Sequence, residues 1–312
     1  MKICIVSYDN NKQNNTLVEY FQSKGFDVQH IDFFSFRYRY PNFLYRIYNA
    51  FLKVFRHKSI KKIYYGKEII KKLSTMEKQD LIITLKGDFV DPDYLKQMKN
   101  FTNRSVAFFK DPVSHYPRIK DVYQCFDETF SFEKKDCEKY GMTFLTNWIF
   151  TSELNQSDGK YWVYNISSMD HRFPILDKVG KALKERNIPY KIQVLKSKKN
   201  YKSDNIEIIN KRLSLDDINE YVKDSKALLE IQKSKQEGLS FRVFECMGYK
   251  KKLLTTNPDV VNYDFYNPNN IMVINEKNFE TIGDFLSTPY EDISKKLYDK
   301  YTIDGWLHRI LK

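Results

Sequence analysis

The sequence alternates short apolar runs with stretches of helical periodicity, and this alternation restricts the possible folds more than any other feature. In the first half of the chain we expect strands at residues 2–8, 26–32, 80–85, 105–109, 128–132 and 142–146. These runs are apolar throughout, which is typical of parallel strands that helices cover on both faces. The first half is therefore predicted to be a Rossmann-like α/β unit.

The same alternation restarts after a polar segment, residues 152–160, which has the composition of a linker. Here we expect strands at 161–166, 190–195, 227–231, 252–255 and 270–274, and helices at 173–186, 215–223 and 240–248. The predicted fold class is α/β, with two tandem Rossmann-like parallel-sheet domains facing a cleft. Their predicted extents are 1–150 and 151–290, followed by a C-terminal helix at 291–312 that packs back on the first domain.

Composition excludes several classes of protein. Hydrophobic residues make up 42% and charged residues 29% of the 312 positions, so a disordered or low-complexity chain is excluded. No apolar run reaches the roughly 20 residues of a membrane-spanning helix, and residues 1–6 are followed too soon by polar residues for a signal peptide. The four cysteines are too sparse for a disulfide framework. We expect a cytoplasmic protein with reduced thiols.

The net charge of +12 is concentrated in one segment. Residues 37–72 contain eleven Lys and Arg residues and a single acidic residue, Glu68. Within the helical region 41–73, apolar side chains recur at helical spacing and basic side chains fall on the other face. The basic residues that we assign to a membrane or acceptor patch are Arg46, Lys53, Arg56, Lys61 and Lys62.

Three interpretations of this segment remain open. A basic, aromatic-rich helix is suited to lying on an anionic membrane surface, where it would hold a lipid-linked acceptor. The same pattern also fits a helix that covers the core and leaves its basic face in water. Binding of nucleic acid is the third interpretation, and no helix-turn-helix, RRM or zinc pattern supports it.

The clearest candidate for a binding site follows the predicted strand at residues 227–231. A loop containing Gly238 and Ser240 leads from this strand into the helix at 240–248. Free backbone N–H groups and the positive end of the helix dipole would then lie at the carboxyl edge of the sheet, where a diphosphate fits. Glu237 precedes the helix and Glu245 lies eight positions later, about two turns in, so the two carboxylates can contact hydroxyl groups on either side of the phosphates.

The run QEGLSFRVFECMGYKKKLLTTN, residues 236–257, resembles the donor-site signature of GT-B glycosyltransferases of the bacterial "glycosyl transferases group 1" type, which carries EGLS-x-R-x-FE. The resemblance covers residues 160–275 by motif and the whole chain by architecture. It implies that Glu245 binds the ribose hydroxyls of a nucleotide sugar and that Glu237 faces the sugar. It also implies that Gly238, Leu239 and Ser240 lie beside the diphosphate.

Other residues are candidates for charge stabilisation or proton transfer. Arg172 follows the first strand of the second domain, where the family often has a basic residue facing the cleft, although a surface arginine is an equal alternative. Lys233 and Arg242 are candidates to neutralise the leaving phosphates. In the first domain, Asp111 and His115 follow the predicted strand at 105–109 and are candidate general bases. The alternative role of Asp111 is to cap the turn before Pro112.

Asp91-Pro92-Asp93 superficially matches the Asp-x-Asp metal motif of the other large glycosyltransferase fold, but an N-cap followed by proline explains it better. We therefore expect neither a divalent metal nor a cofactor, with the nucleotide sugar as a substrate. The expected activity is hexosyl transfer from a nucleotide sugar to a polysaccharide, lipopolysaccharide or lipid-linked acceptor. A GT-B sugar-nucleotide epimerase is the second hypothesis. The third hypothesis is a non-catalytic protein that binds nucleotides or nucleic acid. It ranks last because the carboxylates of Glu237 and Glu245 would repel a nucleic acid.

Overall fold

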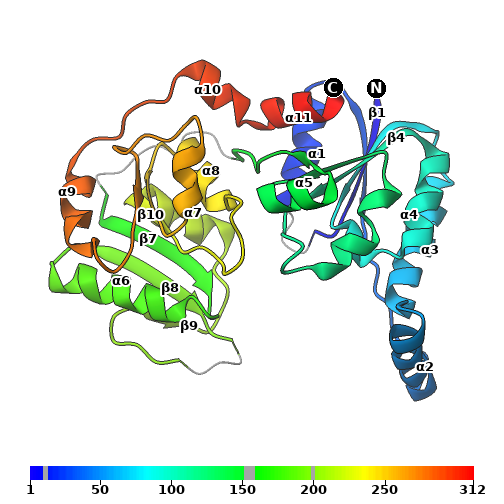
Figure 1. Ribbon diagram of the computed structural model, residues 1–312, viewed down its shortest axis with the longest axis horizontal. Coiled ribbons are helices and arrows are strands. Elements are labelled where there is room, and N and C mark those ends of the chain that lie inside the picture. The colour runs from blue at the N-terminus through cyan, green and yellow to red at the C-terminus, as the bar shows by residue number, and fades with distance from the viewer. Residues whose placement is uncertain (10–12, 151–158, 198–200) are drawn as a thin grey trace. The chain divides into compact units, whose positions relative to one another are not determined.

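The computed structural model describes residues 1–9, 13–150, 159–197 and 201–312. The chain divides into two compact units, of which unit 1 comprises residues 1–146 and 309–312 and unit 2 comprises residues 147–308. Each unit is built on its own parallel sheet (Figure 1). The prediction of two tandem α/β domains is therefore confirmed. The predicted linker at 152–160 falls almost entirely outside the described residues.

The sheet of unit 1 has six parallel strands in the order β2-β1-β3-β4-β5-β6. The strands are β1 (Lys2–Ser7), β2 (Asp27–Asp32), β3 (Gln79–Leu85), β4 (Thr102–Phe109), β5 (Glu128–Ser131) and β6 (Thr143–Phe144). The α-helices of the first 146 residues are α1 (Gln13–Ser23), α2 (Phe43–Phe55), α3 (Ile60–Leu73), α4 (Pro92–Met98) and α5 (Lys134–Tyr140). Ile3, Cys4, Ile5 and Val6 of β1 are fully buried, as the unbroken apolar run predicts for a central strand.

The sheet of unit 2 also has six parallel strands, in the order β12-β11-β10-β7-β8-β9. The strands are β7 (Tyr161–Ser168), β8 (Tyr190–Leu195), β9 (Glu207–Ile209), β10 (Ser225–Glu230), β11 (Lys252–Thr255) and β12 (Ile271–Val273). The α-helices are α6 (Phe173–Glu185), α7 (Leu215–Lys223), α8 (Phe241–Gly248), α9 (Ile282–Ser287), α10 (Lys295–Lys300) and α11 (Ile303–Leu311). Strand β9 was not predicted, because three residues at a sheet edge are too few to show a pattern.

The C-terminal region contains two helices, α10 and α11, where the sequence predicted one helix over 291–312. The last residues, 309–312, belong to unit 1. There Arg104 Nη1 donates to the carbonyl oxygen of Ile310 at 2.6 Å. The expected return of the C-terminus to the first domain is confirmed.

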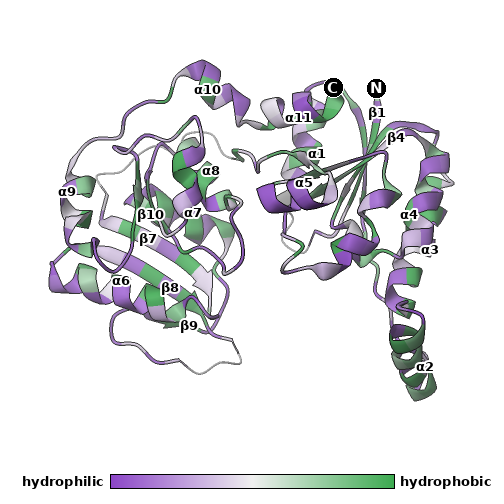
Figure 2. Ribbon diagram, in the orientation of Figure 1, coloured by the Kyte–Doolittle hydropathy of each residue, from purple (hydrophilic) through white to green (hydrophobic). Residues whose placement is uncertain are grey.

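Helix α2 is unlike the other helices of unit 1, because its apolar side chains are not covered. It extends away from the sheet of unit 1 (Figure 1), and much of its ribbon has the colour of hydrophobic residues (Figure 2). Phe43, Leu44, Val54 and Phe55 are each at least 66% exposed. The interpretation that this helix covers the core is therefore wrong.

Each sheet has one topological switch point, where the order in which successive strands are added to the sheet reverses. In unit 1 it lies between β1 and β3, and in unit 2 between β7 and β10. Ligands of open α/β sheets bind outside the carboxyl ends of the strands at such a point. In unit 2 this position is formed by the loop after β7 and the loop after β10.

Candidate functional site

Buried amide side chains fix the loop between β10 and α8. They donate to three successive carbonyl groups: Asn257 Nδ2 to Glu237 at 2.9 Å, Gln236 Nε2 to Gly238 at 3.0 Å and Asn147 Nδ2 to Leu239 at 3.0 Å. All three donor residues are buried. Because a buried carbonyl group without a donor is costly, these hydrogen bonds favour a single loop conformation in front of α8. The roles of the two asparagines could not be predicted from the sequence, because both are distant from the loop along the chain.

The first turn of α8 lacks the side-chain cap that its sequence predicts. Ser240 is the N-cap residue, but its hydroxyl makes no capping hydrogen bond. Its Oγ is buried and lies beside the Glu230 carboxylate, where it acts to lower the pKa of that group. By contrast, Ser214 begins α7 with a complete capping box, in which its Oγ accepts from the Asp217 N–H at 3.1 Å. The start of α8 therefore retains N–H groups and positive dipole character suited to an anion.

Arg242 and Glu245 lie in α8 as an ion pair. Arg242 Nη1 is 2.9 Å from Glu245 Oε2, and the two side chains are 17% and 28% exposed. The ion pair orients the Glu245 carboxylate. A phosphate bound at the start of α8 would compete with this carboxylate for the positive charge of Arg242. The two residues predicted to contact opposite parts of a donor are thus structurally coupled.

Glu230, the last residue of β10, is a buried carboxylate that sequence analysis missed. It is 7% exposed, and the Thr255 hydroxyl donates to its Oε2. Burial raises the pKa of the Glu230 carboxyl. Hydrogen bonds from Thr255 and Ser240, followed by the positive charges of Arg172 and Arg242, oppose this rise. An ionisable residue inside the otherwise apolar run ALLEI was the available signal.

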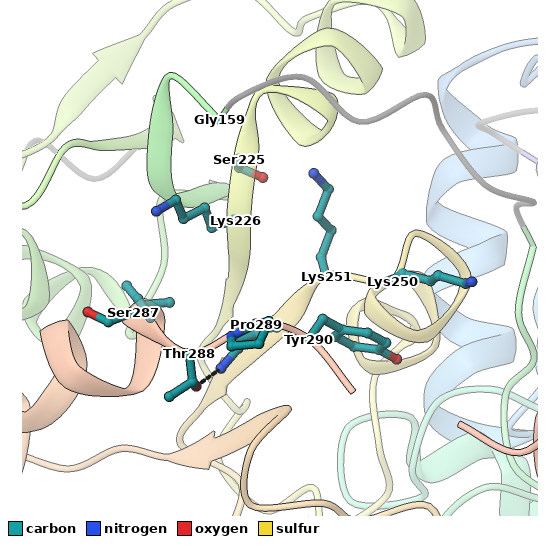
Figure 3. A pocket seen from close by; sticks show the side chains of 11 residues that line it. Gly159, Ser225, Lys226, Lys250, Lys251, Ser287, Thr288, Pro289 and Tyr290 are labelled. Atoms are coloured by element: carbon teal, nitrogen blue, oxygen red, sulfur yellow. Dashed lines mark hydrogen bonds between the residues drawn. The ribbon is translucent and has the colours of Figure 1, made fainter. Parts of the chain in front are cut away.

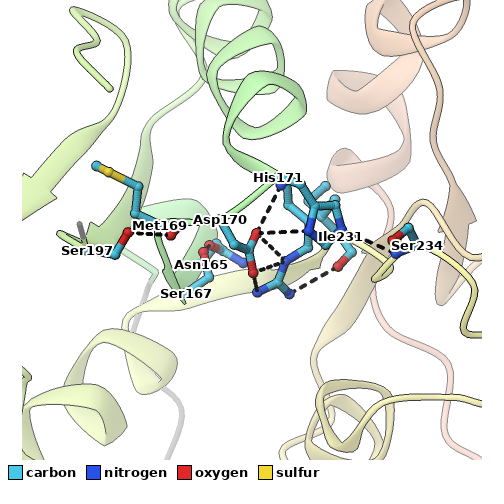
Figure 4. A network of polar contacts seen from close by, with 9 residues as sticks. Asn165, Ser167, Met169, Asp170, His171, Ser197, Ile231 and Ser234 are labelled. Carbon is cyan, nitrogen blue, oxygen red and sulfur yellow. Dashed lines mark hydrogen bonds and ion pairs between the residues drawn. The ribbon is translucent and has the colours of Figure 1, made fainter. Parts of the chain in front are cut away.

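Arg172 lies at the same edge of the sheet, but a carboxylate holds it. Its Nη2 is 2.8 Å from Asp170 Oδ2, and its Nη1 donates to the Ile231 carbonyl at 3.4 Å. Burial acts to raise the pKa of Asp170, and hydrogen bonds from Arg172 outweigh it, so this pKa is lowered. In the same network, the Ser234 N–H donates to His171 Nε2 at 3.2 Å (Figure 4). The loops on the two sides of the switch point are thereby connected.

The two remaining candidates of this loop differ in burial. Glu237 is half-buried, whereas Lys233 is exposed on the outer part of the loop. Unit 2 thus places Arg172 after β7 and the other predicted donor residues in the loop and helix after β10. The structure adds Glu230, Asp170 and His171 to them.

In unit 1, Asp111 lies just beyond the carboxyl end of β4 and forms an ion pair with Lys86. Both side chains are mostly buried. Nearby, Lys110 Nζ donates to Asn14 Oδ1 at 3.3 Å, and burial lowers the pKa of Lys110. His115 follows along the chain and is half-buried, and its backbone N–H donates to the Pro112 carbonyl at 3.0 Å. Lys86 contacts Oδ2 of Asp111, and the ion pair stabilises the ionised form of this carboxylate.

The residues of the predicted basic patch do not share one environment. Arg46, Lys53 and Arg56 are exposed on α2, and Lys61 on α3 is exposed with its Nζ 5.3 Å from the centre of the Tyr65 ring. Lys62 instead turns inward and donates to the Asp88 carbonyl. Burial, followed by the charge of Arg118, lowers the pKa of Lys62 to about 8. Lys62 is therefore not part of an exposed patch.

Asp91 has the structural role that the sequence predicted. Its Oδ1 accepts from the Asp93 N–H at 3.1 Å at the start of α4, with Pro92 in the first turn. Among the described residues, no three His, Cys, Asp or Glu side chains gather as a group of metal ligands.

A cavity of 330 Å³ in unit 2 lies at the opposite edge of the sheet, beside the first residues of β10 and β11 (Figure 3). Four lysines line it: Lys226 lies over the Trp162 ring, Lys250 pairs with Asp292, and the other two bind carbonyl groups near helix ends. Lys251 Nζ donates at 3.0 Å to the carbonyl of Lys223, the last residue of α7, and Lys252 Nζ donates at 2.7 Å to the Phe285 carbonyl in α9. These contacts satisfy C-terminal carbonyl groups, so the lysines have a structural explanation.

Comparison with known proteins shows the fold. No protein-family model matches the sequence, and no curated protein matches it. Among solved structures, the UDP-GlcNAc 2-epimerase from Neisseria meningitidis bound to UDP-GlcNAc aligns over 100% of this chain and 98% of its own, with a TM-score of 0.57 and 11% identity. The glycotransferase of kitacinnamycin aligns over 99% and 98%, with a TM-score of 0.50 and 10% identity.

A third similar structure is the Glycosylation Associate Protein (Gap123) complex from Streptococcus agalactiae, with a TM-score of 0.51 and 9% identity. The alignment covers 80% of this chain and spans only 57% of that longer chain. The similar structures include enzymes of the GT-B fold, which agrees with the two parallel-sheet units described above.

Proposed function

We propose that this chain is a metal-independent glycosyltransferase that transfers a sugar from a nucleotide-sugar donor to a cell-surface glycan or lipid-linked acceptor. The observation that carries the proposal is the start of α8, which lies at the switch point of unit 2 and has no side-chain cap on its first N–H groups. A diphosphate supplies the acceptors that this helix start lacks, because its oxygens accept from backbone N–H groups.

The remaining donor contacts follow from the EGLS-x-R-x-FE resemblance and the geometry of unit 2. In this proposal Gly238, Leu239 and Ser240 bind the diphosphate, Glu245 binds the ribose hydroxyls and Glu237 faces the sugar. Arg242, Arg172 and Lys233 offset the phosphate charge. Catalysis then relies on positioning and on stabilising the charge of the departing diphosphate. Asp111 or His115 accepts the proton of the acceptor hydroxyl.

Substitution of Glu245 tests the donor site. We expect Glu245→Ala to weaken binding of a nucleotide sugar about tenfold or more, since hydrogen bonds to a charged group contribute about 1.5–3 kcal/mol. Isothermal titration against a panel of nucleotide sugars measures the effect. Glu220→Ala is the matched control, because Glu220 is an exposed helical glutamate on α7. Glu245→Gln keeps the shape of the side chain and checks that the loss is not caused by unfolding. Unchanged affinity in Glu245→Ala contradicts the assigned site.

A sugar-nucleotide epimerase is the second candidate, favoured by the similarity to the UDP-GlcNAc 2-epimerase from Neisseria meningitidis. An epimerase needs the donor site but no acceptor. Incubation with a nucleotide sugar alone distinguishes the two reactions. An epimerised product released without an acceptor supports the epimerase, whereas turnover that depends on an added glycan or lipid-linked acceptor supports the transferase.

A further inference from the structure

Exposed apolar side chains are concentrated on α2. Among the described residues, twelve large hydrophobic side chains are exposed, and eight of them belong to this one helix. They are Phe43, Leu44, Tyr45, Ile47, Tyr48, Phe51, Val54 and Phe55. Scattered single exposures are normal on a protein surface, but a contiguous apolar patch marks a surface that binds something.

Helix α2 contacts the rest of unit 1 through a residue of its polar side. Asn49 is the only buried residue of the helix, and its Oδ1 accepts from the Ile60 N–H at 2.9 Å, at the start of α3. At 100° per residue, Arg46 and Lys53 lie on the same side as Asn49, and Phe43, Ile47, Phe51 and Val54 lie on the other. The helix is thus anchored at Asn49 on its polar side, and its apolar side is exposed.

The charge around α2 is of one sign. No Asp or Glu occurs between residues 33 and 67. Arg37, Arg39, Arg46, Lys53 and Arg56 are all exposed. A partner that covers this helix must therefore accept aromatic and aliphatic side chains in its interior and bring negative charge to its rim. An anionic lipid bilayer has both properties.

A second copy of the chain fits this surface less well. It would cover the apolar side of α2 but would bring a second basic segment beside the first, with no acidic residue between 33 and 67 to pair with it.

We propose that α2 binds the surface of an anionic membrane, with Phe43, Ile47, Phe51 and Val54 inserted among the acyl chains and the nearby arginine and lysine side chains among the headgroups. The inference goes beyond the proposed sugar transfer and does not depend on it, because it rests on unit 1 alone. Attachment through α2 would hold unit 1 at the membrane surface, where lipid-linked molecules are available.

The test is cosedimentation of the full chain with vesicles of phosphatidylcholine alone or mixed with phosphatidylglycerol. We expect binding to the anionic vesicles that weakens as salt is added. Phe51→Ser combined with Phe55→Ser, and separately Arg46→Glu, Lys53→Glu and Arg56→Glu together, should each lower the vesicle partition coefficient by about tenfold or more. Thermal melts check that each variant is folded.

Matched controls make the same changes elsewhere. Leu215→Ser with Val261→Ser removes exposed apolar side chains from unit 2, and Lys178→Glu, Lys181→Glu and Lys184→Glu together reverse three exposed charges on α6. Both controls should bind vesicles as the native chain does. A dye attached at Val54→Cys should shift to the blue with anionic vesicles, and the same dye at Leu215→Cys should not.

Three results would overturn the proposal. The first is a native chain that does not bind anionic vesicles. The second is equal loss of binding in the α2 variants and the controls. The third is a stable dimer in sedimentation velocity that becomes a monomer in the Phe51→Ser, Phe55→Ser variant, which would make a second copy the occupant.

Discussion

A carboxylate at the end of a buried strand destabilises a folded chain unless it has partners, and Glu230 occupies this position between β10 and the loop before α8. Thr255 donates to it, and the charges of Arg172 and Arg242 act on it, yet burial still raises the pKa of its carboxyl. Glu245 could be predicted from its spacing to Glu237. Glu230 could not, because a single acidic residue within an apolar run does not reveal which strands and arginines will surround it.

The raised pKa of Glu230 predicts the sign of a stability change. A carboxyl whose pKa is higher in the folded state than in the unfolded state makes folding less favourable as pH rises above the ordinary value of 4.5. Glu230→Gln removes this charge and should raise the free energy of unfolding at pH 7.5 by about 1–3 kcal/mol, while its effect shrinks toward pH 4.5. Urea denaturation at both pH values measures this. A variant less stable than the native chain at pH 7.5 would show that the ionised carboxylate is instead stabilising.

Two helices of unit 2 begin with serine but use it differently. Ser214 closes a complete capping box on α7, whereas Ser240 leaves the start of α8 without a side-chain cap. The sequence predicts the same cap at both helix starts, since serine is a common N-cap residue.

Helical periodicity predicted the helix α2. It did not predict that the apolar side of α2 would remain uncovered, because periodicity identifies an apolar face and not what packs on it.

The two serines give a matched pair of substitutions. Ser214→Ala should lower the free energy of unfolding by about 1 kcal/mol, because it removes a cap. Ser240→Ala should change stability by less than half as much and instead weaken binding of a nucleoside diphosphate. Urea denaturation and isothermal titration of both variants separate the two effects. Equal destabilisation, with unchanged nucleotide affinity in Ser240→Ala, would assign Ser240 an ordinary capping role.

Across the whole molecule, the predicted architecture depends on runs of buried apolar residues, which is why the two six-stranded sheets could be anticipated from the sequence. Features that depend on long-range contacts could not. The inward turn of Lys62, the amide hydrogen bonds of Asn147 and Asn257, and the short edge strand β9 are each decided by residues distant along the chain. The similar solved structures show the same fold at 9–11% identity, so the choice between transfer and epimerisation rests on the residues of the site.

The most direct measurement is a crystal structure of the chain with a nucleoside diphosphate, with UDP as the first probe. The account predicts the diphosphate at the start of α8, within hydrogen-bonding distance of Ser240, and the ribose hydroxyls at Glu245. A diphosphate bound instead among Lys250, Lys251 and Lys252, with the start of α8 empty, would contradict it.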